Sequence, residues 1–387
     1  MRSFRRPSFS KPAKSLLKII LILGVSLLLV EVLMTVFEPQ LFKGLYQYDP
    51  DLGFRVRSHY PMPDGSVTNQ FGFNARDYSL QKPPGVFRIL VVGDSFNWAG
   101  GFKGNYTALL EQKLDSLYGN HRVDVVNVGY TGTHTAEQLA MLKKFGLQYN
   151  PDLVILGFFA GNDFVDADPN RKRIIVNDTY VDIDKRRERK LLGRPIILRS
   201  RLYLFLRQKY AAWKEQRVAS REPEVRSPGS FSRETFLNIE RARLDLFSLA
   251  AARERKYKQN IDYILQSISE MDALLKSRNI GFVVAIFPDE FQVNQDLLKA
   301  VIERYQLNQS DYDVEFTQKL LRSHLESNGI PYVDFLDRFR TVEQKQPLYI
   351  PQDTHWNASG NELAAEILLE ALARRSDVPK WTPSPTR

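Results

Sequence analysis

The sequence predicts an α/β protein in which helices cover both faces of a parallel sheet. Short runs of β-branched and other apolar residues, typical of strands buried on both faces, alternate with longer amphipathic stretches of helical period. This alternation implies parallel strands joined by right-handed crossovers. We therefore expect a three-layer α/β/α domain. Its strands are predicted at residues 87–92, 123–127, 153–159, 281–287 and 331–335.

Residues 1–14 form a basic tail, and residues 15–37 form an apolar segment of 23 residues. A helix of that length can cross a bilayer core of roughly 30 Å. Glu31 interrupts the apolar run, which leaves a cleaved signal peptide, with its shorter apolar core, as the alternative. No alanine lies between Ser15 and Pro50, so the small-residue pattern that a signal peptidase reads is missing. We expect an uncleaved, single-pass membrane anchor, with the tail in the cytoplasm and the rest of the chain periplasmic or extracellular.

The composition excludes several functional classes. The chain has 387 residues, of which 43% are hydrophobic, so it can bury the core of one large domain or two smaller ones. It contains no cysteine, which excludes a disulfide framework and a lipid-modified cysteine, and its five histidines are scattered. We therefore expect no metal site and no cofactor.

The net charge of +9 describes two segments rather than the whole surface. Residues 1–18 carry six basic residues and no acidic one, and residues 185–226 carry 14 Lys or Arg against four Glu, which leaves a net charge of −7 for the remainder. A nucleic-acid-binding domain presents a basic face on its core, so no nucleic-acid partner is expected.

The remaining elements follow in chain order. Residues 38–86 are rich in turn formers, and we interpret them as a stalk of short strands or a hairpin packed on the core. Residues 87–374 carry the alternating pattern, and residues 375–387 form a Pro-rich tail that we expect to be disordered. Amphipathic helices are predicted at residues 107–118, 135–145, 256–278, 313–328 and 359–373.

Residues 165–255 interrupt the pattern with a basic, partly helical sequence broken by Pro and Gly, and we interpret them as an insertion at the rim of the active face. A solvated helical cap is one interpretation. The other is contact with anionic lipid headgroups, because apolar and aromatic residues here interleave with Arg and Lys. These apolar residues are Leu202, Tyr203, Leu204, Phe205, Leu206 and Trp213.

A serine lies directly after the first predicted strand, in the sequence GDSFN. Gly93 permits a tight turn there, and open α/β sheets place their chemistry at the carboxyl ends of strands. Ser95 is therefore the candidate nucleophile. An α/β-hydrolase elbow is not indicated, because it needs a glycine where this chain has Asn97. Ser and Asp are also ordinary turn and helix-capping residues, so this block alone does not define a site.

Three later blocks make this serine part of a pattern: VNVGYTG at 126–132, GFFAGND at 157–163 and PQDTHWNASG at 351–360. Together with GDS they resemble the SGNH (GDSL-like) hydrolase family, named for a Ser, a Gly, an Asn and a His in four separated blocks. The resemblance covers most of residues 45–373 and implies a flavodoxin-like α/β/α fold. The four residues are here Ser95, Gly132, Asn162 and His355, in that order.

The resemblance implies ester chemistry by a Ser–His–Asp acyl-enzyme mechanism. Ser95 would attack the carbonyl, His355 would act as base and then as acid, and Asp353 would hold the imidazole. The backbone N–H groups of Ser95 and Gly132 and the side-chain amide of Asn162 would form the oxyanion hole.

The sequence departs from the family at two positions. Asp353 precedes His355 by two residues where the family usually has three, and this spacing, DTHW, resembles the SGNH-like polysaccharide O-acetyltransferases. Phe96 replaces the leucine of GDSL, which we expect to alter packing more than catalysis. The register of the glycine turn stays open, because Gly129 can stand in for Gly132.

We predict a serine esterase that acts on acyl esters, in particular acetyl esters, with cell-envelope carbohydrates as the suggested substrates. An O-acyltransferase that modifies an extracytoplasmic polysaccharide is the alternative, because water and a sugar hydroxyl as acceptors share the first step. A second alternative is a non-catalytic SGNH domain that binds glycan or scaffolds an envelope assembly. The anchor and the basic insertion predict the membrane and its anionic lipids as further partners.

Overall fold

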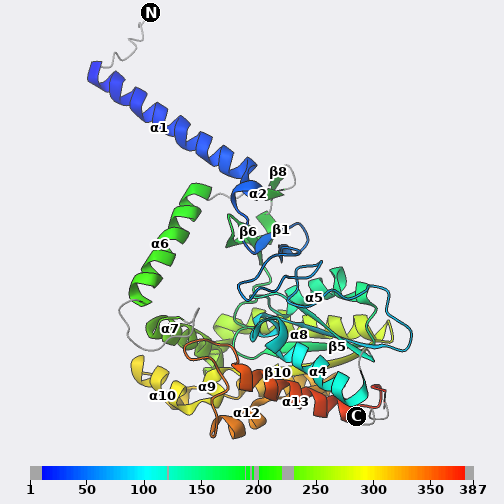
Figure 1. Ribbon diagram of the computed structural model, residues 1–387. Coiled ribbons are helices and arrows are strands. Elements are labelled where there is room, and N and C mark those ends of the chain that lie inside the picture. Colours follow the sequence, from blue (N-terminus) through cyan, green and yellow to red (C-terminus); the bar gives the residue numbers. More distant parts are fainter. Residues whose placement is uncertain are drawn as a thin grey trace, which may run out of the picture.

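The computed structural model describes residues 11–119, 122–187, 189–191, 194–195, 200–219 and 231–379. Residues 1–10 of the basic tail, and the part of the expected disordered tail from residue 380 onward, lie outside this description. The centre of the fold is a parallel sheet that lies between helices (Figure 1). It has five strands in the order β11-β10-β5-β3-β4. All five strands were predicted from the sequence. They are β3 (Phe87–Gly93), β4 (Val123–Gly129), β5 (Leu153–Phe159), β10 (Gly281–Phe287) and β11 (Tyr332–Asp334).

Helices cover both faces of this sheet. One layer contains α5 (Thr135–Lys144), α8 (Ala250–Lys276) and α11 (Phe316–Ser327), and the other contains α4 (Tyr106–Tyr118), α12 (Leu336–Glu343) and α13 (Ala358–Arg374). Successive side chains of a strand point to opposite faces, so Leu90 and Val92 of β3 join the first layer and Ile89 and Val91 join the second. The predicted three-layer α/β/α fold is confirmed.

The order in which the chain connects β3, β4 and β5 opens a crevice beside β3. The chain passes from β3 to its neighbour β4 and then returns to β5 on the other side of β3. Such a reversal opens a crevice at the carboxyl ends of the strands, where open α/β sheets bind ligands. Gly93 of β3 pairs with Gly129 of β4, so the loops that follow both strands leave the sheet at the same level.

The N-terminal helix α1 (Lys11–Val36) projects away from this domain (Figure 1). Its segment Lys14–Val36 contains an 18-residue window with a mean hydropathy of 2.8 and is long and apolar enough to cross a membrane, a property that anchors share with signal sequences. After the short helix α2 (Glu38–Leu41), the stalk contains an antiparallel hairpin of β1 (Tyr46–Asp49) and β2 (Gly53–Val56), as its turn-rich sequence indicated.

The insertion contains a β-hairpin in addition to helices. Strand β6 (Arg171–Val176) pairs with β7 (Thr179–Asp184) across a turn in which Asn177 and Asp178 both have positive φ, at 51° and 57°. Asn and Asp tolerate that left-handed backbone better than most residues, so the sequence did contain a hairpin signal. The other elements are α3 (Gly101–Gly104), β8 (Lys190–Leu191), β9 (Arg194–Pro195), α6 (Arg201–Ala219), α7 (Arg233–Leu244), α9 (Glu290–Val293) and α10 (Gln295–Arg304).

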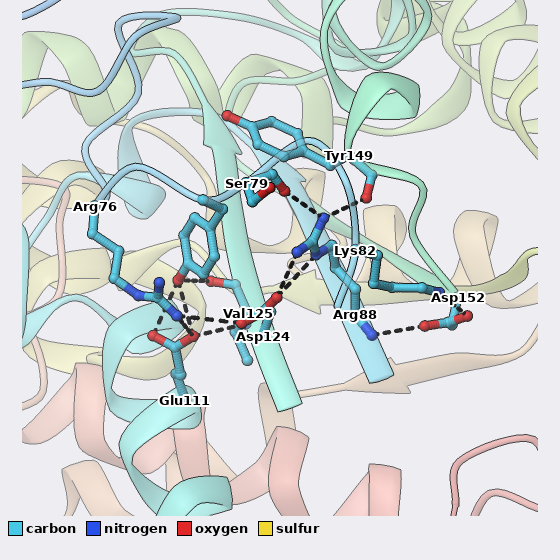
Figure 2. Close-up of polar contacts among 10 residues, drawn as sticks. Arg76, Ser79, Lys82, Arg88, Glu111, Asp124, Val125, Tyr149 and Asp152 are labelled. Carbon is cyan, nitrogen blue, oxygen red and sulfur yellow. Dashed lines mark hydrogen bonds and ion pairs between the residues drawn. The ribbon is translucent and has the colours of Figure 1, made fainter. Parts of the chain in front are cut away.

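A buried ion pair joins the stalk to the amino ends of β3 and β4 (Figure 2). Arg88 is 1% exposed and donates from Nε and Nη2 to Asp124 Oδ2 at 3.0 and 2.7 Å. Its Nη1 donates to the carbonyl oxygens of Ser79, at 2.9 Å, and of Tyr149, at 2.7 Å. A buried guanidinium needs such a full set of acceptors. The stalk is therefore part of the domain, and this pair lies at the end of β3 opposite Ser95.

Candidate active site

Ser95 is the first residue of a three-residue 3₁₀ turn that follows β3. Asp94 begins this turn, and its Oδ1 accepts a hydrogen bond from the Phe96 N–H at 2.9 Å. The third residue of the turn, Asn97, is buried, and its Nδ2 donates to Asn127 Oδ1 at the end of β4 at 2.8 Å. These bonds fix the turn on both sides of Ser95, which is itself half-buried.

The sequence-predicted triad residues lie together although 260 positions separate Ser95 from His355. His355 Nε2 lies 2.7 Å from Ser95 Oγ, and His355 Nδ1 lies 2.6 Å from Asp353 Oδ1. A carboxylate only accepts, so Nδ1 carries the proton and Nε2 is left to accept from the Ser95 hydroxyl. Partial burial acts to raise the pKa of Asp353, but the hydrogen bonds and charge of His355 hold this pKa below its ordinary value. Asp353 is therefore ionised at neutral pH.

The loop that carries His355 is closed by its own backbone. The Ile350 N–H donates to the His355 carbonyl at 2.9 Å, and the Asp353 N–H donates to the Ile350 carbonyl at 3.0 Å. An isolated bridge between Tyr349 and Trp356 closes the loop further. This turn brings side chains two residues apart to one side, which explains how a DTH spacing supports the contact between Asp353 and His355.

Aromatic rings support the imidazole from the core side. The ring of Phe96 lies 5.3 Å from that of His355 and 4.6 Å from that of Trp356. Trp356 is fully buried and also packs on Phe287, with 4.7 Å between ring centroids. Phe96, the residue that replaces the leucine of GDSL, therefore fills the space between the nucleophile turn and the histidine loop.

Gly132 lies in the loop after β4 and adopts a left-handed φ of 73°. Its carbonyl oxygen accepts a hydrogen bond from Arg173 of β6. The neighbouring Thr131 is held by the hydroxyl of Tyr180, which donates to its carbonyl at 3.3 Å, and by a side-chain contact with Tyr46. The stalk and the inserted hairpin thus fix the backbone of the predicted oxyanion loop.

The backbone donors distinguish the two candidate glycines. The Gly129 N–H donates to Asn127 Oδ1 at 3.1 Å, so it is already used. The N–H groups of Gly132 and Ser95 donate to no other residue in the part of the chain that the structure describes. Gly132 therefore fits the role of an oxyanion donor and Gly129 does not.

Asn162 follows β5, the strand on the other side of β3. Its Nδ2 donates to Asp166 Oδ2 at 3.3 Å, which uses one of the two donors of an amide nitrogen and leaves the other. The preceding Gly161 packs against Asp289, because a Cβ at this position would lie 1.8 Å from Asp289 Oδ2. The loop that presents Asn162 therefore requires glycine at position 161.

Arg243 is a site residue that sequence reasoning missed. It lies on α7 of the insertion, and its Nη1 donates at 2.8 Å both to Thr354 Oγ1 and to Glu240 Oε1. The same atom lies 3.5 Å from Asp289 Oδ2, and the guanidinium lies 5.3 Å from the centre of the Phe159 ring. No motif in the sequence indicates a role for this arginine, because it lies in a segment rich in Arg and Lys. Its contacts become known only from the structure.

Buried carboxyl groups surround the site. Burial raises the pKa of Glu240, and the nearby charge of Asp289 raises it further. Burial also raises the pKa of Asp94, to about 6. The pKa of Asp163 is raised well above its ordinary value by burial and by the charge of Asp94. Asp163 also accepts from the N–H groups of Thr135 and Phe159 at 2.8 Å, so it ties the first residue of α5 to the end of β5.

The arrangement can perform nucleophilic acyl chemistry. It holds a hydroxyl, an imidazole and a carboxylate in hydrogen-bond sequence, beside backbone donors with no other partner among the described residues. Among those residues, no three His, Cys, Asp or Glu side chains are arranged to hold a metal ion.

Comparison with known proteins agrees with the sequence resemblance. Residues 246–385 match the family model described as an SGNH hydrolase-like domain, acetyltransferase AlgX. The matched segment contains Asp353 and His355, whereas Ser95 precedes it. The resemblance to SGNH hydrolases is thereby confirmed. No curated protein matches the sequence.

Three solved structures that match this chain are distant from it in sequence. The acetyl xylan esterase AlAXEase has 15% identity and a TM-score of 0.39, with 74% of this chain and 99% of that chain covered. An acetylxylan esterase from Geobacillus stearothermophilus has 12% identity and a TM-score of 0.40, with 79% and 100% covered. A lipase/acylhydrolase from Enterococcus faecalis has 14% identity and a TM-score of 0.38, with 78% and 100% covered.

Proposed function

We propose that this protein is an SGNH-type serine enzyme that cleaves acetyl esters through an acyl-enzyme on Ser95. The observation that carries the proposal is the position of His355, whose two ring nitrogens lie 2.7 Å from the Ser95 hydroxyl and 2.6 Å from Asp353. A residue in such a position can take the hydroxyl proton while the carboxylate stabilises the imidazolium that results. The ionised state of Asp353 supports that role.

In the first half-reaction, Ser95 Oγ attacks the ester carbonyl and its proton passes to His355 Nε2. The carbonyl oxygen becomes an oxyanion, which the N–H groups of Ser95 and Gly132 and the amide of Asn162 would stabilise. The tetrahedral intermediate then collapses, the bond to the alcohol breaks, and His355 returns the proton to the leaving oxygen. The products are the free alcohol and acetyl-Ser95.

In the second half-reaction, an acceptor hydroxyl gives its proton to His355 and attacks the acetyl carbonyl. The bond to Ser95 Oγ breaks, and Ser95 recovers the proton from His355. With water as acceptor the product is acetate. With a sugar hydroxyl as acceptor the product is an acetylated sugar, and no new group is needed at the triad.

Transfer to a sugar hydroxyl is the second candidate function, and two observations favour it. The Asp353–His355 spacing resembles that of the SGNH-like polysaccharide O-acetyltransferases, and the matching family model carries an acetyltransferase description. We propose cell-envelope carbohydrates as the substrate class for either reaction. We also propose that α1 is retained as an anchor and that the α/β domain lies outside the cytoplasm, because the basic tail precedes the apolar helix.

The test is the turnover of an aryl acetate by the full-length chain in detergent, with and without an oligosaccharide acceptor. Mass spectrometry of quenched samples would locate the acetyl group on Ser95. We expect Ser95→Ala to lose turnover and labelling, while the matched variant Ser116→Ala, at an exposed position of α4, keeps both.

The acceptor decides between the two reactions. Acetylated oligosaccharide formed at the expense of acetate identifies a transferase, and acetate alone identifies an esterase. Equal turnover in wild type and Ser95→Ala, both folded, would reject Ser95 as the nucleophile. A wild-type protein that neither turns over nor becomes acetylated would support the non-catalytic, glycan-binding alternative.

A further inference from the structure

Glu31, the acidic residue within the apolar helix α1, forms the N-terminal cap of α6. Its carboxylate accepts hydrogen bonds from the Ser200 hydroxyl, from the Arg201 N–H at 2.7 Å and from the Leu202 N–H at 3.1 Å. Free N–H groups at a helix start need such acceptors, and a negative charge also suits the positive end of the helix dipole. The start of α6 is therefore attached to α1.

A second contact strengthens this attachment. Glu38, just after α1, forms an ion pair with Arg201 at 2.7 Å, and both side chains are largely buried. Glu38 also accepts from the Asn177 N–H at 2.8 Å, at the tip of the β6–β7 hairpin. The end of α1, the inserted hairpin and the start of α6 thus form one joint.

This joint sets the level of α6 relative to a membrane that α1 would cross. Glu31 lies five residues before the end of the candidate span at Val36, and a rise of 1.5 Å per residue places it roughly 8 Å from that end. That depth lies within the range of about 5–10 Å to which interfacial amphipathic helices bury their apolar face. Figure 1 shows that α6 diverges from α1 at this point and stands apart from the α/β domain.

One face of α6 carries an exposed aromatic stripe. Tyr203, Leu206, Tyr210 and Trp213 follow each other at intervals of three, four and three residues, which places them on one side of a helix. Their exposed fractions are 56%, 56%, 63% and 50%. Leu204, on another side of α6, is buried against the β6–β7 hairpin, so the stripe is not the face that packs on the protein.

Cations border this stripe. Arg207 and Lys214 follow Tyr203 and Tyr210 by four residues each and are exposed. Lys209 lies over the Phe205 ring at 5.5 Å, and Arg217 lies over the Trp213 ring at 5.1 Å. Aromatic side chains flanked by Lys and Arg are typical of helices that lie at the surface of anionic membranes.

We propose that α6 lies in the headgroup layer of an anionic membrane, with the Tyr203–Trp213 stripe inserted and its cations at the lipid phosphates. The helix α7, which follows α6 in the chain, carries Arg243 and so reaches the loop of His355. Docking of α6 would thus hold the active face close to the bilayer surface. The proposal depends on α1 remaining attached and does not depend on the reaction at Ser95.

The test uses the full-length chain reconstituted in liposomes of phosphatidylcholine, with or without phosphatidylglycerol. The chain has no cysteine, so Trp213→Cys provides a single site for a fluorescent label. Val25→Cys, in the middle of α1, and Leu117→Cys, on α4 at the far side of the domain, are the controls (Figure 1). Nitroxide groups at shallow or deep positions of the lipids quench the label according to its depth.

We expect the label at position 213 to be quenched by shallow nitroxides more than by deep ones. The label at 25 should respond to deep nitroxides, and the label at 117 to neither. A label at 213 that behaves like the one at 117 would overturn the proposal. An unquenched label at 25 would overturn it as well, because α1 would then not span the bilayer.

The anionic requirement has its own test. In the Trp213→Cys background, Arg207→Gln with Lys214→Gln should lower the ratio of docked to undocked α6 roughly fivefold per cation in phosphatidylglycerol liposomes. The matched pair Lys258→Gln with Lys299→Gln, exposed on α8 and α10, should not change it. Equal quenching with and without phosphatidylglycerol would contradict the assignment to anionic lipid.

Discussion

Arg243 Nη1 donates a hydrogen bond to Thr354 Oγ1 across 2.8 Å, and Thr354 stands in the chain between Asp353 and His355. The inserted segment therefore contacts the loop that carries two of the three proposed catalytic side chains. The same guanidinium is held by Glu240 and Asp289, so α7, α9 and this loop meet at one cation. This contact gives the insertion a role in positioning that a solvated cap would not have.

Thr354→Val tests this contact, because it removes the hydroxyl and keeps the shape of the side chain. A hydrogen bond to a charged group contributes about 1.5–3 kcal/mol, so we expect kcat for an aryl acetate to fall by about tenfold or more with little change in KM. Thr341→Val, at an exposed position of α12, is the control and should keep kcat. An unchanged kcat in Thr354→Val would assign the bond to stability alone.

Asp353→Asn tests the orientation of the imidazole. An amide in place of the carboxylate no longer stabilises the imidazolium and favours the wrong tautomer, so kcat should fall by roughly 10⁴-fold with the fold intact. Asp337→Asn, on the exposed side of α12, serves as the control. Steady-state kinetics with an aryl acetate and circular dichroism decide the outcome, and a loss below tenfold would remove Asp353 from the proposed triad.

Gly161→Ala tests the support of the Asn162 loop. The added Cβ would lie 1.8 Å from Asp289 Oδ2, so the loop must shift and Asn162 with it. One oxyanion donor contributes about 3–4 kcal/mol to the barrier, and we expect kcat to fall on the order of 10²-fold. Gly104→Ala has no atom within 4 Å of its new Cβ and should behave like the wild type. Similar kcat values for both variants would contradict a role for this loop in the reaction.

Asp94 predicts a pH dependence of stability. Burial raises its native pKa to about 6, above its ordinary value of 3.8, so the folded state binds more protons than the unfolded state between these values. The contribution of Asp94 to the free energy of unfolding is fully present below about pH 4 and is lost as the pH rises through about 6. Asp94→Asn stays neutral and keeps an oxygen for the Phe96 N–H. The free energy of unfolding of Asp94→Asn, measured relative to that of the wild type, should therefore increase from pH 4 to pH 7.

Urea unfolding of both proteins at each pH measures this difference, with Asp262→Asn on the surface of α8 as the control. Other carboxyl groups titrate in both proteins, so only the difference between wild type and variant reports Asp94. A difference that stays constant from pH 4 to 7 would show that Asp94 titrates in the native state as it does in the unfolded chain.

The Arg88–Asp124 pair predicts a large cost for removing one partner. Arg88→Ala removes the buried cation from Asp124, which among the described residues keeps only its ion pair with the exposed Arg76 at 3.3 Å, and should lower the free energy of unfolding by about 3–5 kcal/mol. Arg338→Ala breaks a half-exposed pair with Glu370 and should cost no more than about 1 kcal/mol. Urea denaturation measures both, and equal losses would mean that the Arg88 pair is solvated in solution.

The sequence alone predicted the sheet and the central contacts of the site. Five apolar runs predicted the positions of the strands, because a parallel strand that is buried on both faces is itself a continuous apolar run. Ser95, Gly132 and Asn162 were assigned from short blocks that follow β3, β4 and β5, and His355 from a block just before α13, through the resemblance to SGNH hydrolases. The structure brings His355 against Ser95. Local patterns were enough where the fold brings strand ends to one edge.

The contacts made by the insertion could not be predicted in this way. Arg243 has the same appearance in the sequence as the surface arginines around it, and only tertiary packing brings it to Thr354. Glu31 looked like a defect in an apolar helix, because its partners at Ser200 and Arg201 lie about 170 residues away. The turn at Asn177 carried a local signal, which the basic composition of the segment obscured.

The cap that Glu31 provides has a consequence for how the protein can be handled. A chain shortened to begin near residue 40 would lose Glu31 and Glu38 together, and the first N–H groups of α6 and the Arg201 guanidinium would lose these acceptors. Truncation after the apolar helix would therefore remove a folding partner of the insertion as well as its proposed attachment to lipid. By these contacts, the part of the chain that resembles a leader helix packs as a structural element against the insertion.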